Sequence, residues 1–457
     1  MRRLLKTIFC TAAVGAFAMI RAAASYAEGV ERIAQENSAD TLQLSLDEAL
    51  KIALSESLTV QIADMEIEKT GYDKKISYAA LFPDVNFSAT YQRTIKKQTM
   101  SMTMGGQSQS IKVGMDNTYN AGFSASMPIV NFALWKSLDI SAKSVELAVE
   151  QSKQSRQDLV NQVETAFYAC LLAHDAYEVY KENYLNARET YEQTKAKYES
   201  GRVAKYDMIR AEVNMQNAEP NMYDAQNSMV LATWQLKALI GMDLNQEIKC
   251  KGSLDDYISK FNDVSIAGNE IYVENNSQLK QLAIQSEILT DTYKAKVAQF
   301  YPSLAGTVSY SWIAMNNNFK FNHYKWNPYS VAGLTLAIPI FSGGERYYGL
   351  KQTKLQQKQL ALQQENARRG LVVAAKSNLN SMETALKQYN AAIATVDGAQ
   401  TGFDIAKKRY EIGSGTILDM NDAQLALLQA KLNVKNSIYQ YLVAKSALDL
   451  TLGNNKN

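Results

Sequence analysis

Two aspartates spaced three residues apart are the strongest candidates for chemistry in this 457-residue chain. Asp419 and Asp422 lie in the segment LDMNDA, and on a helix this spacing places both carboxylates on one face. If several copies of the chain met at one axis there, the crowded like charges would raise the carboxyl pKa values and recruit cations. The alternative is that both residues only cap a helix and face solvent. The residues alone leave both interpretations open.

The segment that contains these aspartates is the second copy of a motif. At a constant offset of 212, the two copies share seven of seventeen residues without a gap. Gly201 and Gly413 occupy the place where a helix needs a left-handed C-cap. Asp207 and Asp419 stand where a following helix favours an acid near its start. Each copy is therefore predicted to be a turn between two helices, called a tip below. The copies are KAKYESGRVAKYDMIRA at 195–211 and KKRYEIGSGTILDMNDA at 407–423.

Other chemical signals are weak. Met100, Met102 and Met104 alternate in a predicted loop at 98–116, and thioethers are ligands for Cu(I), but a variable extracellular loop or a strand continuation explains the pattern better. The chain holds two histidines, and His174 falls at a packing position. Phosphate-loop, HExxH and nucleophile-elbow motifs do not occur. The sequence therefore predicts no enzyme, no cofactor and no metal site.

The start of the chain indicates export. Residues 1–27 carry basic residues, then an apolar run and small residues ending at Ala27, which is the layout of a secretory signal peptide. Residues 28–44 are predicted to form a polar N-terminus of the mature chain. Removing 1–27 takes away four of the 48 basic residues and none of the 46 acids, so 44 basic residues remain and the net charge is near −2. This balance argues against a nucleic-acid partner.

Cysteine use fits an exported protein. After cleavage only Cys170 and Cys250 remain, and two isolated cysteines make neither a metal cluster nor a disulfide framework. Export with so few cysteines suits a Gram-negative envelope protein. No later stretch approaches the roughly 20 apolar residues that a membrane helix needs.

The chain is an internal duplication with residues 45–244 and 271–453 as its two halves. Each half is predicted to run helix, strand, loop, strand, long helix, tip, helix. Prolines bound the strands, and apolar residues alternate with polar ones along them, as in VNFSATYQ from 85 to 92. A connector at 245–270 and a tail at 454–457 complete the chain. The strands are predicted at about 83–97, 117–130, 302–315 and 328–342.

The helices are predicted to be long. The first begins at a Ser45–Glu48 capping box and runs to Phe82. Residues 133–200 contain no proline or glycine, and a helix of that length would measure roughly 100 Å. Apolar residues from Val372 to Tyr410 follow the 3,4 spacing of a coiled coil, matched 212 residues earlier. The remaining helices are predicted at about 205–239 with a kink at Pro220, at 277–301 and at 417–452.

Four strands of about ten residues match the span of a tilted membrane strand. They cannot close a barrel alone, and open sheet edges are not tolerated in lipid. Other copies of the chain must therefore complete the barrel, and three copies would supply twelve strands.

With this plan the chain resembles the TolC family of outer-membrane efflux proteins, from about Ser45 to Gly453. The resemblance rests on the duplicated plan, the prolines around the strands and the two tips. It implies a mainly α fold with a transmembrane β part: a homotrimer with a long α-helical barrel and a twelve-stranded β-barrel in the outer membrane. It also implies a periplasm-spanning channel with a periplasmic adaptor protein and an inner-membrane transporter as partners, and outer-membrane lipid around the strands.

The resemblance carries over to single residues at the tips. Gly201 and Gly413 match the glycines of the adaptor-contacting turns. Asp207 and Tyr410 match an aspartate and a tyrosine of the network that closes the periplasmic entrance. Asp419 and Asp422 match the aspartate pair that rings this entrance and binds cations.

One departure concerns the gate. The family pattern has an arginine two residues after the second tip glycine, where this chain has Gly415. The gate salt bridge is therefore not predicted, and Arg202 and Arg210 are the arginines that would have to replace it.

The leading interpretation is a passive exit duct for small molecules in a tripartite efflux system. A type I protein-secretion duct would look nearly identical in sequence. A trimeric coiled-coil envelope protein that transports nothing is a third class, and the duplicated amphipathic strands argue against it. Energy for transport would have to come from a partner.

Overall fold

The computed structural model describes residues 42–104, 107–263 and 271–454. Contacts divide these residues into two units. Unit 1 comprises the described residues up to Val60, those of Arg156–Ile271, and those from Ala374 onward. Unit 2 comprises the described residues of Gln61–Ser155 and Tyr272–Val373. The predicted signal peptide at 1–27 lies outside the described residues, as do residues 28–41, 264–270 and 455–457.

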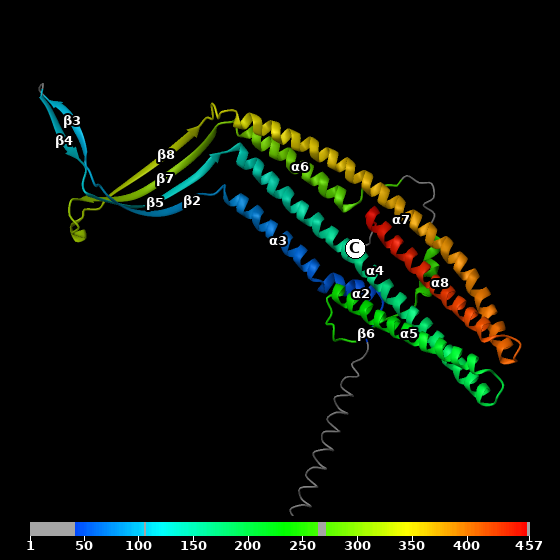
Figure 1. The fold of residues 1–457 in the computed structure, drawn as a ribbon. Coiled ribbons are helices and arrows are strands. Elements are labelled where there is room, and N and C mark those ends of the chain that lie inside the picture. The colour runs from blue at the N-terminus through cyan, green and yellow to red at the C-terminus, as the bar shows by residue number, and fades with distance from the viewer. Residues whose placement is uncertain (1–41, 105–106, 264–270, 455–457) are drawn as a thin grey trace, which may run out of the picture. The chain divides into compact units, whose positions relative to one another are not determined.

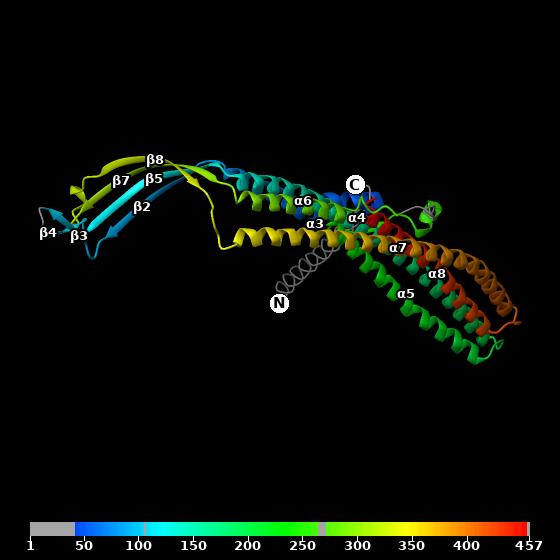
Figure 2. The same cartoon turned by 90° about the horizontal axis from the view of Figure 1, so that it is seen from above.

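Unit 2 contains a four-stranded antiparallel sheet in the order β2-β5-β7-β8. The strands lie side by side in both Figure 1 and Figure 2. The four predicted strands are confirmed, although β2 and β8 end earlier than the predicted 97 and 342. Their bounds are β2 (Asp84–Arg93), β5 (Asn117–Val130), β7 (Ser303–Asn316) and β8 (Asn327–Ala337).

The register gives the sheet two chemically different faces. Cross-strand pairs such as Phe87↔Phe123, Phe123↔Tyr310 and Leu304↔Leu336 join apolar residues along the whole sheet. Pairs such as Ser88↔Gly122 and Ser124↔Ser309 join small and polar residues on the opposite side. The alternation is therefore in phase across β2, β5, most of β7 and the Ala332–Leu336 part of β8, whereas Ile313, Tyr329 and Val331 fall on the polar side. The apolar face carries Val85, Phe87, Ala89, Tyr91, Tyr119, Ala121, Phe123, Ala125, Met127, Leu304, Gly306, Val308, Tyr310, Trp312, Ala314, Ala332, Leu334 and Leu336.

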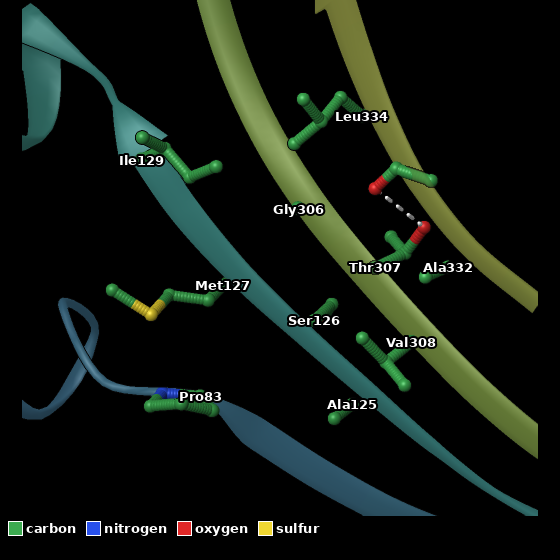
Figure 3. A pocket seen from close by; sticks show the side chains of 11 residues that line it. Pro83, Ala125, Ser126, Met127, Ile129, Gly306, Thr307, Val308, Ala332 and Leu334 are labelled. Atoms are coloured by element: carbon green, nitrogen blue, oxygen red, sulfur yellow. Dashed lines mark hydrogen bonds between the residues drawn. The ribbon is translucent and has the colours of Figure 1, made fainter.

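A shallow hollow lies on the apolar face at one end of the sheet (Figure 3). It exists because Gly306 has no side chain: a Cβ there would lie 3.2 Å from Ile129 Cδ1 and 3.8 Å from Leu334 Cδ2. A bulge in β5 lets Ile129 reach over the next strand, and Pro128 beside it needs no ladder hydrogen bond at such a site. The hollow belongs to the apolar face and brings no convergent polar groups.

The predicted loop at 98–116 is wrong for most of its length. Strands β3 (Gln98–Met104) and β4 (Gln107–Val113) pair antiparallel as a hairpin, with Met100 opposite Ile111. The alternation of Met with Ser and Thr was thus a strand signal. Met100 is exposed. The second predicted loop is confirmed between β7 and β8, apart from a short 3-10 turn, η2 (Phe321–His323).

The first predicted helix is two helices. α2 (Leu46–Glu56) ends at Ser57, whose ψ of 128° is extended, and α3 (Leu58–Ala79) follows. The capping box at Ser45 is confirmed, because the Glu48 N–H donates to Ser45 Oγ and Glu48 Oε2 accepts from the Ser45 N–H. The helix is interrupted here without a glycine or proline in the sequence. Because Ser57 is buried, tertiary packing stabilises the interruption.

The other predicted helices are confirmed to within a few residues. α6 ends three residues before the predicted 301, α4 ends one residue before the predicted 200, and Pro220 lies within α5. Seam residues are buried in unit 1, as Val163, Phe167, Ala375 and Met382 show. The helices are α4 (Phe132–Glu199), α5 (Lys205–Ile240), α6 (Ser277–Ala298), α7 (Glu345–Glu411) and α8 (Ile417–Leu452).

The connector is docked rather than loose. Strand β6 (Ile248–Cys250) pairs in parallel with β1 (Leu42–Leu44), and the 3-10 segment η1 (Leu254–Asp263) follows. Phe261 packs between the rings of Tyr389 and Tyr441, with centroid distances of 5.0 and 4.2 Å. These residues join the apolar core of unit 1.

Lys435 ties the connector to two long helices. Its Nζ lies 3.1 Å from Asp175 Oδ2 on α4 and 2.6 Å from Asp255 Oδ2 on η1. Asp175 also accepts hydrogen bonds from the Ser253 hydroxyl and the Leu254 N–H. The described connector residues are thus part of the unit 1 fold.

Among the described residues, every helix is too short or too polar to cross a membrane by itself.

We expect Gly122→Val to destabilise the sheet. A Cβ at Gly122 would lie 2.6 Å from the Tyr310 carbonyl oxygen and 2.7 Å from Ser311 Cα, both of them backbone atoms of the neighbouring strand. Overpacking of this kind costs about 1–3 kcal/mol. Denaturant titration in detergent measures the loss. Gly333→Ala is the matched control, because its Cβ would meet Thr307 Oγ1 at an ordinary 3.5 Å. Equal stability of the two variants would contradict this account of the register.

Candidate functional site: the paired tips

The first tip closes with a left-handed glycine. Gly201 has φ of 73°, and its N–H donates to the Tyr198 carbonyl at 2.8 Å. The Arg202 N–H donates to the Lys197 carbonyl, also at 2.8 Å. This pattern satisfies carbonyls that the end of α4 would otherwise leave unpaired, as in a Schellman motif.

The second tip has the same two turn-closing hydrogen bonds as the first. Gly413 has φ of 78°, its N–H donates to Tyr410 O at 3.2 Å, and the Ser414 N–H donates to Arg409 O at 2.8 Å. The predicted left-handed glycines are confirmed at both tips. The duplication therefore extends from sequence to hydrogen-bond pattern.

The two tips are joined through a buried tyrosine. Tyr410 shares a 2.8 Å hydrogen bond with Thr194 Oγ1 on α4, and Thr194 is fully buried. Lys197 Nζ lies 4.7 Å from the centre of the Tyr410 ring and donates to the Tyr410 and Glu411 carbonyls at 3.4 and 3.3 Å. An apolar cluster of Ala211, Phe403, Ile417, Met420 and Leu427 surrounds this contact.

This tyrosine breaks the symmetry of the duplication. Its counterpart Tyr198 is 36% exposed, whereas Tyr410 is 7% exposed. The position equivalent to Thr194 is Ala406, which offers no hydroxyl. Burial raises the pKa of Tyr410, the Thr194 hydrogen bond lowers it, and the negative charge of Asp207 raises it further. Tyr410 is therefore a neutral phenol at neutral pH.

Polar contacts extend this junction away from the tips. Lys407 Nζ lies 3.2 Å from Glu189 Oε2, which joins α7 to α4. Gln424 Nε2 donates to Asn183 Oδ1 at 2.9 Å, and it also donates to the Asn183 carbonyl at 3.0 Å, which joins α8 to α4. The two helical hairpins of unit 1 are thus held together along this stretch.

Asp419 caps a helix. It is the N3 residue of a capping box in which the Asp419 N–H donates to Thr416 Oγ1 and the Thr416 N–H donates to Asp419 Oδ2. Hydrogen bonds from Thr416, side chain first and backbone second, lower the pKa of Asp419, and the charge of Arg409 adds to this. Burial opposes this shift without reversing it, so within one chain the carboxyl is ionised at neutral pH. Asp422 is exposed three residues further on.

Asp207 lies in the first turn of α5, as predicted, but α5 starts differently from α8. Its N-cap Ala204 provides no side-chain hydrogen bond. Arg210, one of the two arginines considered for the gate, donates to the Tyr206 hydroxyl at 2.7 Å within the same helix. Within one chain, the polar side-chain contacts described for Tyr410 are its hydrogen bond with Thr194 and the Lys197 ammonium above its ring.

Close packing explains the glycine at 415. A Cβ there would lie 3.0 Å from Arg409 Cβ and 3.3 Å from Tyr410 N. The Gly415 N–H also donates to the Arg409 carbonyl at 3.0 Å. A side chain at 415 would have to push against the backbone at the end of α7. Arg409 is the arginine at this tip, and its Nη2 donates to Ser414 O.

Reasoning from the sequence missed Thr194, Lys197 and Arg409. The Thr416-x-x-Asp419 spacing of a capping box was present and could have assigned Asp419 its cap. The Thr194–Tyr410 contact spans 216 residues, and no local pattern signals it. In the part of the chain described here, no group of three or more His, Cys, Asp or Glu side chains could hold a metal ion.

A sheet with one apolar face and long paired helices defines the class of outer-membrane channels that combine a β part with a helical part. Residues 49–242 and 271–454 match the model of the outer membrane efflux protein family, and the chain belongs to this family. Members are channels rather than enzymes. The protein is an outer-membrane efflux channel of Gram-negative type that extends into the periplasm.

Three relatives illustrate the likeness. The outer membrane protein TolC of Vibrio cholerae is 24% identical over 385 residues, 82% of this chain and 83% of the relative. The alkaline protease secretion protein AprF of Pseudomonas aeruginosa is 22% identical over 418 residues, 91% of this chain and 85% of that one. The crystal structure of the Campylobacter jejuni CmeC outer membrane channel superposes with a TM-score of 0.70 at 18% identity, covering 90% of this chain and 87% of that chain.

We expect Tyr410→Phe to loosen the junction of the two tips. The change leaves the ring in place and removes a buried hydrogen bond, which contributes about 1 kcal/mol. A double-mutant cycle with Thr194→Val measures the coupling by denaturant titration. Tyr198→Phe is the matched control at the equivalent, more exposed position. Additive effects of the Tyr410 and Thr194 changes would show that the pair is not coupled.

Proposed function

We propose that this channel is the exit duct of a tripartite efflux system, assembled as a homotrimer that conducts small molecules passively. A periplasmic adaptor protein and an inner-membrane transporter complete the system and supply its energy. The observation that supports this proposal is the register of the sheet, which places a mostly apolar surface on one side and mostly small or polar residues on the other.

The open edges of the sheet support the trimer. In the described residues, the outer edges of β2 and β8 pair with no other strand. Unpaired backbone groups in hydrocarbon cost several kcal/mol each, so both edges need partners. Joining β8 of one copy to β2 of the next repeats the four-strand unit around an axis, and three copies give the twelve-stranded barrel. The apolar face then meets lipid and the Ser/Thr face lines the lumen.

The tips are the proposed docking sites for the adaptor. Gly201 and Gly413 are exposed, and apolar side chains stand out beside them: Tyr206 is 65% and Ile412 is 79% exposed. Contiguous exposed apolar patches commonly mark contact surfaces, and these side chains would contribute to such a patch at each tip. Two nearly identical turns per chain give a trimer six similar sites for adaptor subunits.

A protein-secretion duct is the second candidate. It is favoured by the relative named for alkaline protease secretion, which matches over 91% of this chain. The two candidates share assembly and location and differ only in what passes through.

Transport assays in the native cell separate the two candidates. We expect deletion of the coding gene to raise intracellular accumulation of small toxicants several-fold, with restoration by the wild-type chain. Secreted protein in the medium is measured in parallel. Loss of one secreted protein with unchanged toxicant accumulation would favour the secretion duct, and loss of neither would contradict both.

The homotrimer is tested by mass. We expect light scattering with detergent correction to give three copies of the chain per particle, because only a closed ring satisfies both sheet edges. Val331→Pro, inside β8, removes one backbone N–H from the strand and should reduce assembly. A monomer or dimer that still conducts ions in planar bilayers would contradict the twelve-stranded barrel.

The aspartate ring is tested by its charge. If Asp419 and Asp422 from three copies surround one entrance, the opening favours cations and multivalent cations block it, because closely spaced charges interact strongly where water is limited. We expect Asp419→Asn with Asp422→Asn to abolish the block in single-channel recordings.

The control for this test is Thr416→Ala. It removes the cap of α8 while it keeps both carboxylates, so the cation block should weaken, because Asp419 is no longer held in place, but should not disappear. If the double Asn variant keeps normal selectivity and normal block, Asp419 and Asp422 do not form the ring.

A separate test concerns the residues proposed to close the periplasmic entrance. Asp207 and Tyr410 are proposed to hold the tips together, so Asp207→Ala or Tyr410→Phe should raise the resting conductance several-fold and leave the multivalent block intact. An unchanged resting conductance in both variants would remove them from the gate.

A further inference from the structure

The two cysteines that are far apart in sequence are neighbours in unit 1. Cys170 lies on α4 and Cys250 ends β6, and 80 positions separate them. The Cys250 thiol donates to Cys170 Sγ at 2.8 Å. Both residues are thiols in this structure, and both are buried, with 3% and 8% of their surface exposed. A disulfide bond measures about 2.05 Å, so joining the sulfurs requires a shift of less than one ångström.

We propose that Cys170 and Cys250 form a disulfide bond that fastens the connector to α4. The proposal rests on the placement of unit 1 in the periplasm, which is an oxidising compartment where adjacent thiols form disulfides. It concerns a covalent modification and is independent of what the channel exports.

The bond would reinforce the first part of the connector. Strand β6 is three residues long and pairs only with the three residues of β1 in the described structure. Cys250 is the last residue of β6, opposite Leu44. Beyond it, the connector is held by Lys435 and Phe261, and a covalent link at Cys250 would tie its first part directly to α4. The closed loop contains the first tip and α5, so the bond also restricts the unfolded chain.

The reaction is a thiol–disulfide exchange with a periplasmic oxidoreductase that carries a reactive disulfide. The Cys170 thiolate attacks a sulfur of that disulfide, forms a mixed disulfide and releases one thiolate of the oxidoreductase. The Cys250 thiolate then attacks Cys170 Sγ, forms the Cys170–Cys250 bond and expels the second thiolate. Two electrons pass to the oxidoreductase, and the two protons end on its reduced dithiol.

The pair favours Cys170 as the attacking sulfur. The hydrogen bond from Cys250 lowers the pKa of Cys170, and a second contact with Thr233 Oγ1 at 3.6 Å acts in the same direction. Because both sulfurs are buried in the finished fold, oxidation takes place while the chain folds after export, once Thr233 and Cys250 have reached Cys170 and before the rest of unit 1 closes over the pair.

The test counts thiols in the full chain taken from cells. Envelope protein is quenched with acid, denatured and treated with a polyethylene glycol maleimide before and after reduction. We expect no adduct before reduction and two adducts after it. Cys170→Ala and Cys250→Ala should each show one adduct without reductant, which confirms that the label reaches each site. Two adducts on the unreduced wild-type chain would overturn the proposal, whether or not the channel exports its substrates.

A second measurement does not depend on the folding of the alanine variants. A protease site inserted at Gly201, in the exposed first tip, lets the assembled protein be cut between the two cysteines. We expect the two fragments to migrate together on a denaturing gel without reductant and to separate with it. In a host that lacks the periplasmic oxidoreductase, the share of linked fragments should fall several-fold. Fragments that separate without reductant in the normal host would contradict the disulfide.

Discussion

The unpaired backbone edges of the β2–β5–β7–β8 sheet are the constraint on which the rest of the structure depends. Water can satisfy an open edge, but hydrocarbon cannot, and the sheet belongs to an outer-membrane protein. In the described part of a single chain, the edges of β2 and β8 are open and a mostly apolar face is exposed. A closed ring of copies would remove both problems with the same contact, since pairing the edges would also turn every apolar face outward. Assembly and membrane insertion would then be aspects of one hydrogen-bonding requirement.

Because the chain plan is repeated, the arrangement of the strands also determines the arrangement of the helices. Each half contributes two strands, and each pair of strands is followed by a long helix, a tip and a returning helix. In the proposed trimer, a ring of strands would carry a ring of helical hairpins. The hairpins are not equivalent within one chain: Tyr410 is buried against Thr194, whereas Tyr198 is more exposed and the position equivalent to Thr194 is Ala406. In that trimer, duplication would provide the regular ring, and such differences between the halves would provide places where the tips can be held or released.

The parts of this structure that the sequence could predict are those with a local physical cause. Prolines bound the strands because they end ladders and helices, and Gly201 and Gly413 mark the tips because a positive φ strains other residues. The break at Ser57 and the β3–β4 hairpin were missed. Packing alone holds the break at Ser57. In the hairpin, the Gly-, Ser- and Gln-rich composition favoured a loop even though the alternation of Met100, Met102 and Met104 was visible. Contacts between distant segments were out of reach, above all Tyr410 with Thr194 and Cys170 with Cys250. No local sequence pattern identifies a partner 80 or more positions away; the only hint is that each of these residues is of a type that requires a partner when buried.

The two interpretations of Asp419 are compatible once the copies are considered. Within a chain, its carboxylate accepts from the Thr416 N–H and its pKa is lowered, so the charge is fixed in position and present at neutral pH. A ring of like charges around an axis opposes this effect and costs free energy unless cations neutralise it. A carboxylate that already caps a helix cannot swing away from its neighbours to relieve this repulsion without breaking the start of α8. The capping role would therefore make the proposed ring rigid, and a rigid ring of ionised carboxylates binds cations more strongly than a flexible one.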